Sequence, residues 1–204
     1  DAAGCALLRE ASGSPQEVAA LAHLPAGTDP RFDAAATLLR LDGPAVSVES
    51  RKADLLARFA ARGPTDVLDA DASRALWADL REVAPLARRP GIVWRLTLAP
   101  SDGPAVVDAL RGAGLALDAV LYDWAGGLVW LALAPASGAE AEAIRAAVDR
   151  VGGTATLVRA DAATRRTVPV FHPEPPPLAA LSARVKAAFD PDGLFEPGRK
   201  TQGV

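Results

Sequence analysis

Short strand patterns that come in pairs, with amphipathic helices between the pairs, constrain the fold of this chain more than any other feature. Each strand pattern either alternates apolar with polar residues or is a short apolar run bounded by Gly or Pro. Strands are expected over residues 16–24, 36–41, 65–69, 92–99, 117–124, 128–134 and 154–158. Helices are expected over residues 2–11, 44–62, 72–83, 102–112, 138–151 and 178–189.

Helices that alternate with strand hairpins in this way all cover the same face of a sheet. The order therefore predicts an α+β fold, with an antiparallel sheet of about seven strands, helices on one face, and ferredoxin-like character. The two halves of the chain can be interpreted as two ferredoxin-like units fused into one sheet. No sequence repeat links the halves, so this second interpretation rests on element order alone.

The C-terminal region differs from the rest because it is rich in proline and carries one isolated amphipathic helix. Its apolar stripe is formed by Leu178, Leu181, Val185 and Phe189, which recur at helical spacing. Asp190-Pro191 ends the helix, since the residue before a proline is disfavoured in the helical region. We therefore divide the chain into an α+β domain of substrate- or cap-type over 1–169 and a tail with a docking helix over 170–204.

Composition excludes several classes of protein. The formal net charge of −3 over 204 residues gives no basic surface for nucleic acid. No apolar run approaches the roughly 20 residues that a membrane span needs. Cys5 is the single cysteine, which precludes an internal disulfide and suits a reducing, cytoplasmic compartment. The chain as given starts without Met, so we expect a fragment or a processed form.

No familiar catalytic or metal-binding motif is present in the sequence. His23 and His172 are the two histidines, and they lack the close spacing of a zinc pair, so no metal is expected. A glycine-rich phosphate loop between a strand and a helix is also missing. From residue patterns alone the chain reads as a soluble α+β domain.

Four segments taken together are more specific. They are Ala22-His23-Leu24-Pro25, the strand Ile92-Val93-Trp94-Arg95-Leu96, the hairpin Asp123-Trp124-Ala125-Gly126-Gly127 with Trp130, and the tail Phe171-His172-Pro173 followed by Asp190-Pro191-Asp192-Gly193-Leu194-Phe195 and Pro197-Gly198-Arg199. In this order they resemble the C-terminal part of the FAD-binding (E) subunits of glycolate oxidase. The tail resembles the end of FAD-linked oxidases of the vanillyl-alcohol oxidase type.

The resemblance implies a cofactor and partners. In that family a flavin-binding domain precedes this region and holds most of the FAD, and the tail returns to lie against it. FAD is accordingly expected in the full-length protein, whereas this chain alone should bind it weakly or not at all. The resemblance further implies a small 2-hydroxy acid as substrate, and the D and iron–sulfur F subunits as partners, through which the complex could be peripheral at the inner membrane. Glu196 departs from the family, which usually has Asn there.

Strand alternation supplies candidate site residues independently. If helices cover the apolar face, His23, Arg40 and Arg95 project from the other face, where Arg can bind a carboxylate or a flavin edge with two parallel hydrogen bonds. The simpler interpretation is that these groups are solvated, and Trp94 is expected in the core. The remaining candidates for a cofactor- or substrate-facing position are Trp124, Trp130, His172 and Arg199. For His172, a structural role competes with that of a general base.

Three functions remain open at this point. The first is the substrate or cap domain of an FAD-linked 2-hydroxy-acid oxidoreductase subunit. The second is a non-catalytic, flavoprotein-like assembly subunit. The third is a stand-alone ferredoxin-like module that binds a small molecule. The tail and the Asp-Trp-x-Gly-Gly hairpin argue against the third, and the catalytic residues stay unknown.

Overall fold

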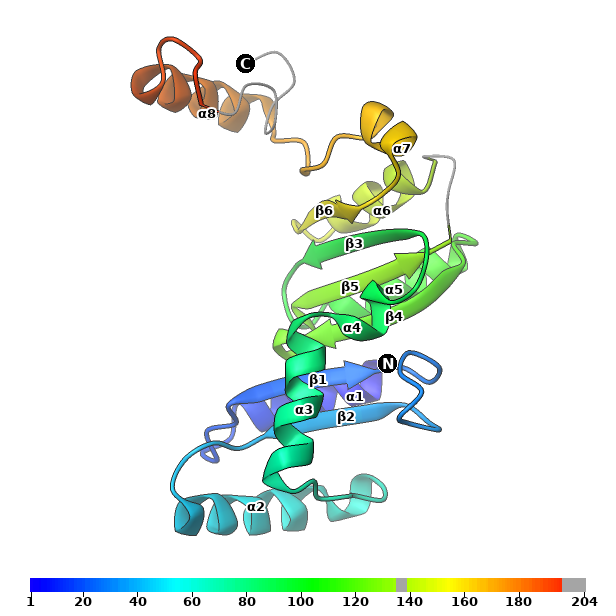
Figure 1. The fold of residues 1–204 in the computed structure, drawn as a ribbon, viewed down its shortest axis with the longest axis vertical. Helices are drawn as coiled ribbons and strands as arrows, with labels where there is room; N and C mark the ends of the chain where they lie inside the picture. The colour runs from blue at the N-terminus through cyan, green and yellow to red at the C-terminus, as the bar shows by residue number, and fades with distance from the viewer. Residues whose placement is uncertain (135–138, 196–204) are drawn as a thin grey trace.

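The computed structural model describes residues 1–134 and 139–195, and its centre is one antiparallel sheet of six strands (Figure 1). The spatial order of the strands is β2-β1-β4-β5-β3-β6. The strands are β1 Ala20–Leu24, β2 Ala36–Arg40, β3 Ile92–Thr97, β4 Leu117–Asp123, β5 Leu128–Leu133 and β6 Thr154–Arg159. The α-helices are α1 Ala2–Ser12, α2 Ala45–Phe59, α3 Ala70–Arg81, α4 Ala84–Ala87, α5 Gly103–Gly112, α6 Ala139–Asp149, α7 Ala162–Thr167 and α8 Pro176–Phe189.

The second half of the sheet is a ferredoxin-like unit. Its elements run β3-α5-β4-β5-α6-β6, and its strands lie in the order β4-β5-β3-β6, so the first strand of the unit is central. Pro104 in the first turn of α5 is compatible with a helix start, because the amide that proline lacks has no partner there. The predicted α+β class and ferredoxin-like character are confirmed.

The first half adds a hairpin rather than a second ferredoxin-like unit. Strands β1 and β2 pair with each other, and β1 joins the sheet through β4, with Ala22 opposite Asp123. The segment 65–69, expected as a seventh strand, is not a strand. Val67 and Leu68 are about half exposed there, and Asp69 caps α3 by accepting hydrogen bonds from the amides of Asp71 and Ala72. A segment with no neighbouring strand to pair with gains nothing from an extended conformation.

Helices cover both faces of the sheet, and the two coverings differ in extent. One face, which we call the core face, packs the apolar sides of α5 and α6 onto Trp94, Leu96 and Leu131. On the opposite face, Leu76 and Leu80 of α3 and Leu86 of α4 cover β1 and part of β4 and β5. The buried residues of the strands that they contact are Ala22, Leu24, Ala119, Leu121 and Ala132. The expectation that all helices lie on one face is wrong for α3 and α4, which return across the sheet after β2.

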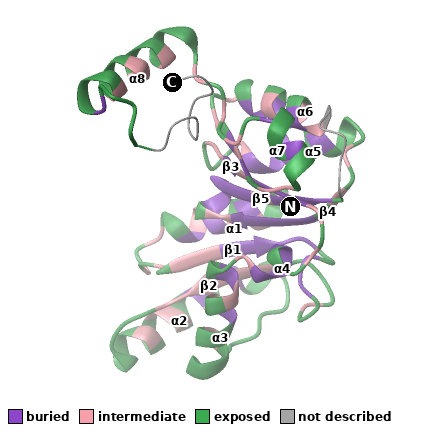
Figure 2. Cartoon of the chain, turned by 45° about the horizontal axis from the view of Figure 1, so that its top comes forward, coloured by how far each residue is buried: buried purple, intermediate pink, exposed green. Residues whose placement is uncertain are grey.

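The C-terminal segment leaves the sheet at β6. The backbone amide of Leu157 donates to the carbonyl of Val170, so the chain first runs along the edge of β6. Helix α8 then projects away from the body of the molecule (Figure 1). It has no buried residue, and Figure 2 shows it in green and pink where the strands are mainly purple. Its predicted apolar stripe exists but faces solvent: Leu178 is 48%, Leu181 46%, Val185 50% and Phe189 84% exposed.

Candidate functional site

Arg95 leaves the sheet on the face opposite the main core, as strand alternation predicts. Trp94, its neighbour, is 2% exposed and packs under α5 and α6, so its expected core position is confirmed. The register places Arg95 opposite Trp130, and Trp130 opposite Leu121. Arg40 reaches the same face because it lies opposite Ala20 on β1. We call this side of the sheet the arginine face.

The Nε atom of Arg95 lacks the hydrogen-bond partner that a buried donor normally has. Its guanidinium carbon lies 6.0 Å from the centroid of the Trp130 ring, in cation–π geometry. Its Nε is buried and has no hydrogen-bond partner in the part of the chain that the structure describes. A buried N–H without an acceptor costs free energy. Arg95 as a whole is only half-buried, so an incoming carboxylate meets the accessible part of its guanidinium.

A pocket of about 560 Å³ opens on the arginine face between α3 and the sheet. Small side chains of β1, Ala20 and Ala22, form its floor together with Leu121. The walls and rim carry larger groups from α3 and from the ends of β2 and β4. These are Arg40, Arg74, Trp77, Arg81, Asp123 and Trp124. The pocket therefore combines an apolar floor with three guanidinium groups and one carboxylate.

Trp124 reaches the rim of this pocket from a strained turn. Its φ is +49°, and Ala125 follows with φ +57°, both in the left-handed region that non-glycine residues rarely adopt. The Asp123 carboxylate accepts a hydrogen bond of 2.6 Å from the Trp124 amide and fixes the turn. Burial raises the pKa of the Asp123 carboxyl, and the hydrogen bond from Trp124 opposes part of that rise. Trp124 stays 56% exposed.

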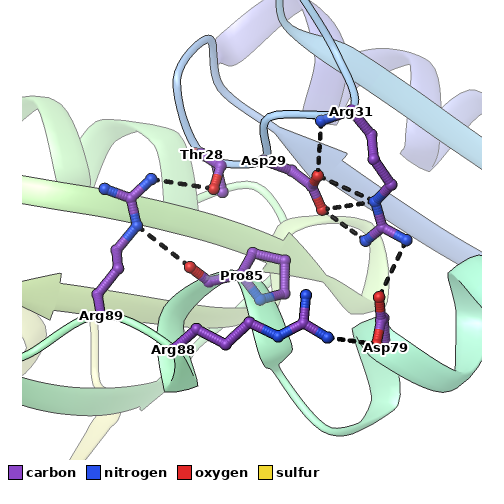
Figure 3. Close-up of polar contacts among 7 residues, drawn as sticks. All are labelled: Thr28, Asp29, Arg31, Asp79, Pro85, Arg88 and Arg89. Carbon is purple, nitrogen blue, oxygen red and sulfur yellow. Dashed lines mark hydrogen bonds and ion pairs between the residues drawn. The ribbon is translucent and has the colours of Figure 1, made fainter.

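An ion-pair network holds α3, the outer wall of the pocket, against the loop after β1 (Figure 3). Asp29, 4% exposed, accepts several hydrogen bonds from Arg31, whose guanidinium also reaches Asp79 on α3 at 3.1 Å. Arg88 bonds the other Asp79 oxygen at 3.0 Å. The Arg31 guanidinium lowers the pKa of the Asp29 carboxyl. This chain of ion pairs ties the loop after β1 to the C-terminal half of α3.

Arg89 completes this network with backbone contacts. Its guanidinium donates to the carbonyls of Gly27, Thr28, Pro85 and Asp118. The Thr28 hydroxyl in turn donates to the carbonyl of Val120 at 3.0 Å. The loop after β1 is consequently bound to α4 and β4, and α3 is fixed through it.

His23 is not on the arginine face, and the expectation that it projects beside Arg95 is wrong. The register puts His23 opposite Tyr122 and Thr37, on the core face, where α1 covers it and leaves 4% exposed. Its Nδ1 lies 2.9 Å from the Thr37 hydroxyl. A side chain at Gly4 of α1 would collide with the imidazole, since a Cβ there would lie 2.2 Å from Nδ1. Burial, aided by the N-terminal amine, lowers the pKa of His23 to about 4.

The other candidates are scattered. His172 Nδ1 accepts from the Ala155 amide at 3.2 Å, and Nε2 lies 2.8 Å from an Asp149 oxygen, so it ties the tail to β6 and α6. Arg199 and Glu196 lie outside the described residues. Cys5 is fully buried, and burial raises the pKa of its thiol to about 11, as suits a packing residue. In the described ranges no group of three or more His, Cys, Asp or Glu gathers to hold a metal ion.

No protein-family model matches the chain. Over 124 residues the chain is 36% identical to the glycolate oxidase subunit GlcE of Escherichia coli (strain K12). This chain is similar to GlcE. The matched part makes up 60% of the chain and 30% of GlcE. The similarity to GlcE confirms the resemblance that the sequence motifs predicted.

Sequence reasoning missed the contribution of α3 to the arginine face. Arg74, Trp77 and Arg81 follow one another at helical spacing of three and four residues, which was the available signal. The pattern could not say that α3 crosses to the face opposite α5 and α6. Of the predicted site residues, the structure brings Arg40 and Trp124 together in the pocket, while Arg95 and Trp130 lie on the same face of the sheet but do not line the pocket. No helix in residues 1–134 or 139–195 is both long and apolar enough to cross a bilayer.

Proposed function

We propose that this chain forms the substrate-side domain of a GlcE-like subunit in an FAD-linked 2-hydroxy-acid oxidase, with glycolate as the expected type of substrate. The similarity to GlcE supports the family of reaction. The observation that carries the role of this domain is the half-buried Arg95 guanidinium, stacked on Trp130, whose Nε has no acceptor among the described residues. In this proposal an anionic substrate or the flavin edge binds the accessible part of the Arg95 guanidinium.

The fit to FAD is confined to one end of the cofactor. Within residues 1–134 and 139–195 no glycine-rich loop precedes a helix in the manner of a pyrophosphate site. In this proposal the phosphates of FAD are bound by other residues of a full-length subunit. Bound flavin supplies the hydride acceptor for oxidation of a hydroxy acid. The arginine face contributes a fixed positive charge at Arg95, and Trp130 keeps that guanidinium in a constant orientation.

The partners in this proposal are the remaining subunits of the oxidase, including D and iron–sulfur F types. The exposed stripe of α8 is an apolar surface of the kind that another domain or subunit covers. The same observation favours the second candidate function, a non-catalytic assembly subunit whose sheet face docks on a catalytic partner. The two candidates predict different behaviour for Arg95.

The test is Arg95→Gln in the full-length subunit, assembled with its partners. A charge-assisted contact to a carboxylate is worth about 1.5–3 kcal/mol, so kcat/KM for glycolate should fall roughly tenfold or more, or flavin should be lost on purification. Arg166→Gln, an exposed arginine on α7, is the matched control and should leave both unchanged. Parental turnover and flavin content in the Arg95 variant would instead favour the assembly role.

A further inference from the structure

The pocket between α3 and β1 is separate from the Arg95 position. Arg95 lies on β3, and the pocket floor lies on β1 and β4, with β5 between β3 and β4. Adjacent strands are about 4.8 Å apart, so the centres of the two positions are separated by roughly 10–15 Å. Neither Arg95 nor Trp130 lines the pocket. We propose that this pocket binds an organic anion with a flat apolar body.

The shape of the pocket comes from the alanines on its floor. Ala20 lies opposite Arg40 and Ala22 opposite Asp123, so each small side chain leaves room between longer ones. Ala78 on α3 continues the apolar lining. The resulting volume of about 560 Å³ is within the range of roughly 300–1,000 Å³ that small-molecule sites occupy.

Two indoles make the pocket suited to a flat body. Trp77 projects from α3 and is half-buried, whereas Trp124 stands at the rim and is 56% exposed. Trp124 is unfavourable in two ways: its apolar surface is exposed to water, and its backbone is strained in the left-handed region. The Asp123 carboxylate and the glycines after Ala125 maintain that turn. A ligand that stacks on the indole removes its apolar surface from water and offsets the first cost.

The rim selects an anion. Arg40, Arg74 and Arg81 outnumber Asp123, the one carboxylate in the lining. Each arginine pairs with an acidic neighbour that is itself well exposed: Asp42 is 58%, Asp71 91% and Glu82 71% exposed at the side chain. Exposed pairs of this kind contribute little, so an arriving carboxylate or phosphate displaces them easily and gains the bidentate geometry of the guanidinium.

The experiment uses the 204-residue chain and follows the indole N–H signals of its tryptophans by NMR. Phenylacetate should shift the Trp77 and Trp124 signals, while the Trp94 signal in the core stays in place. Two matched probes separate the requirements: 2-phenylethanol has the body without the charge, and inorganic phosphate has charge without the body. Both should bind at least about fivefold more weakly than phenylacetate.

Variants assign the effect to the rim. Arg40→Gln, and separately the exposed double change Arg74→Gln with Arg81→Gln, should weaken phenylacetate binding roughly tenfold, as expected for a lost charge-assisted contact. Asp123→Asn should tighten it, and Arg166→Gln should leave it unchanged. The unshifted Trp94 signal shows that each variant is folded. The proposal is overturned if phenylacetate moves neither Trp77 nor Trp124, if 2-phenylethanol binds equally well, or if both arginine variants bind like the parent.

These measurements need neither flavin nor turnover. Failure of phenylacetate to bind would remove the second pocket and leave the role of Arg95 in the oxidase untouched. Conversely, an Arg95 variant with parental activity would leave the pocket proposal intact.

Discussion

Helices α5 and α8 both carry apolar residues at helical spacing, yet one is buried and the other is exposed in the structure. Leu110 on α5 is 1% exposed beneath the sheet, whereas Leu181 on α8 is 46% exposed. Both helices begin with proline in the first turn. Periodicity therefore predicts a helix and its apolar side, but it does not say whether the partner surface lies in the same chain. The following predictions test that difference, from the largest effect to the smallest.

Leu110→Ala should have the largest effect on folding. Truncating a fully buried leucine leaves a cavity, which costs about 2–5 kcal/mol in the free energy of unfolding. Leu181→Ala is the matched control on α8 and should change it by less than about 0.5 kcal/mol, as for an exposed site. Urea denaturation measures both. A loss of more than 1.5 kcal/mol at Leu181 would mean that α8 packs on the body in solution.

The buried His23 should make stability depend on pH. Its pKa is lowered from 6.5 to about 4 in the folded chain, so the unfolded chain binds the extra proton between these values. The contribution of neutral His23 is complete above pH 6.5 and is lost as the pH falls through this window, by a total of roughly 3 kcal/mol. Denaturation midpoints from pH 7.5 to 4 measure it.

The control for that prediction is the other histidine. His23→Gln should flatten the pH dependence between pH 6.5 and 4, whereas His172→Gln should retain it. The expectation is contradicted if both variants follow the parental curve.

Asp29→Asn should loosen the attachment of α3. The substitution removes the charge of a carboxylate whose side chain is 3% exposed and leaves Asp79 as the remaining charged partner of Arg31, at a cost of about 1–3 kcal/mol. Because the Arg31 guanidinium lowers the Asp29 pKa, the parental contribution is present above pH 4 and disappears as the pH falls below it. Hydrogen exchange of the amides in α3 should accelerate in the variant, while those of α5 should not change.

The smallest effect on stability should come from the α8 surface itself. Replacing Leu181 and Phe189 by Ser removes two exposed apolar groups that no described core includes. The melting temperature should stay within about 2 °C, while self-association at high concentration should fall. Sedimentation velocity checks this. If self-association is undiminished, the surface through which copies of the chain associate lies on the arginine face instead.

The sequence predicted strands and their faces well wherever alternation was strict. Trp94 and Arg95 fell on opposite faces as expected, because a strand sends neighbouring side chains to opposite sides. The prediction for His23 was wrong for a tertiary reason. Helix α1 covers one side of β1 and α3 covers the other, so the side of β1 that carries His23 is buried although it is not strongly apolar. The pocket was not predicted for the same reason, because it exists only where α3 returns over β1. Contacts between elements distant in the chain leave no periodic signal.

The contacts of His172 with the Ala155 amide and the Asp149 carboxylate set how far α8 can move from the sheet. Beyond His172, three residues that include Pro173 and Pro175 lead to the helix, and a proline-rich spacer extends by about 3.1 Å per residue. The first turn of α8 therefore stays within roughly 10 Å of His172 at the β6 edge. A surface assembled beside that edge meets the helix at an effective concentration on the order of millimolar, whatever the concentration of the protein. Capture of α8 is an intramolecular event in any assembly that holds such a surface near β6.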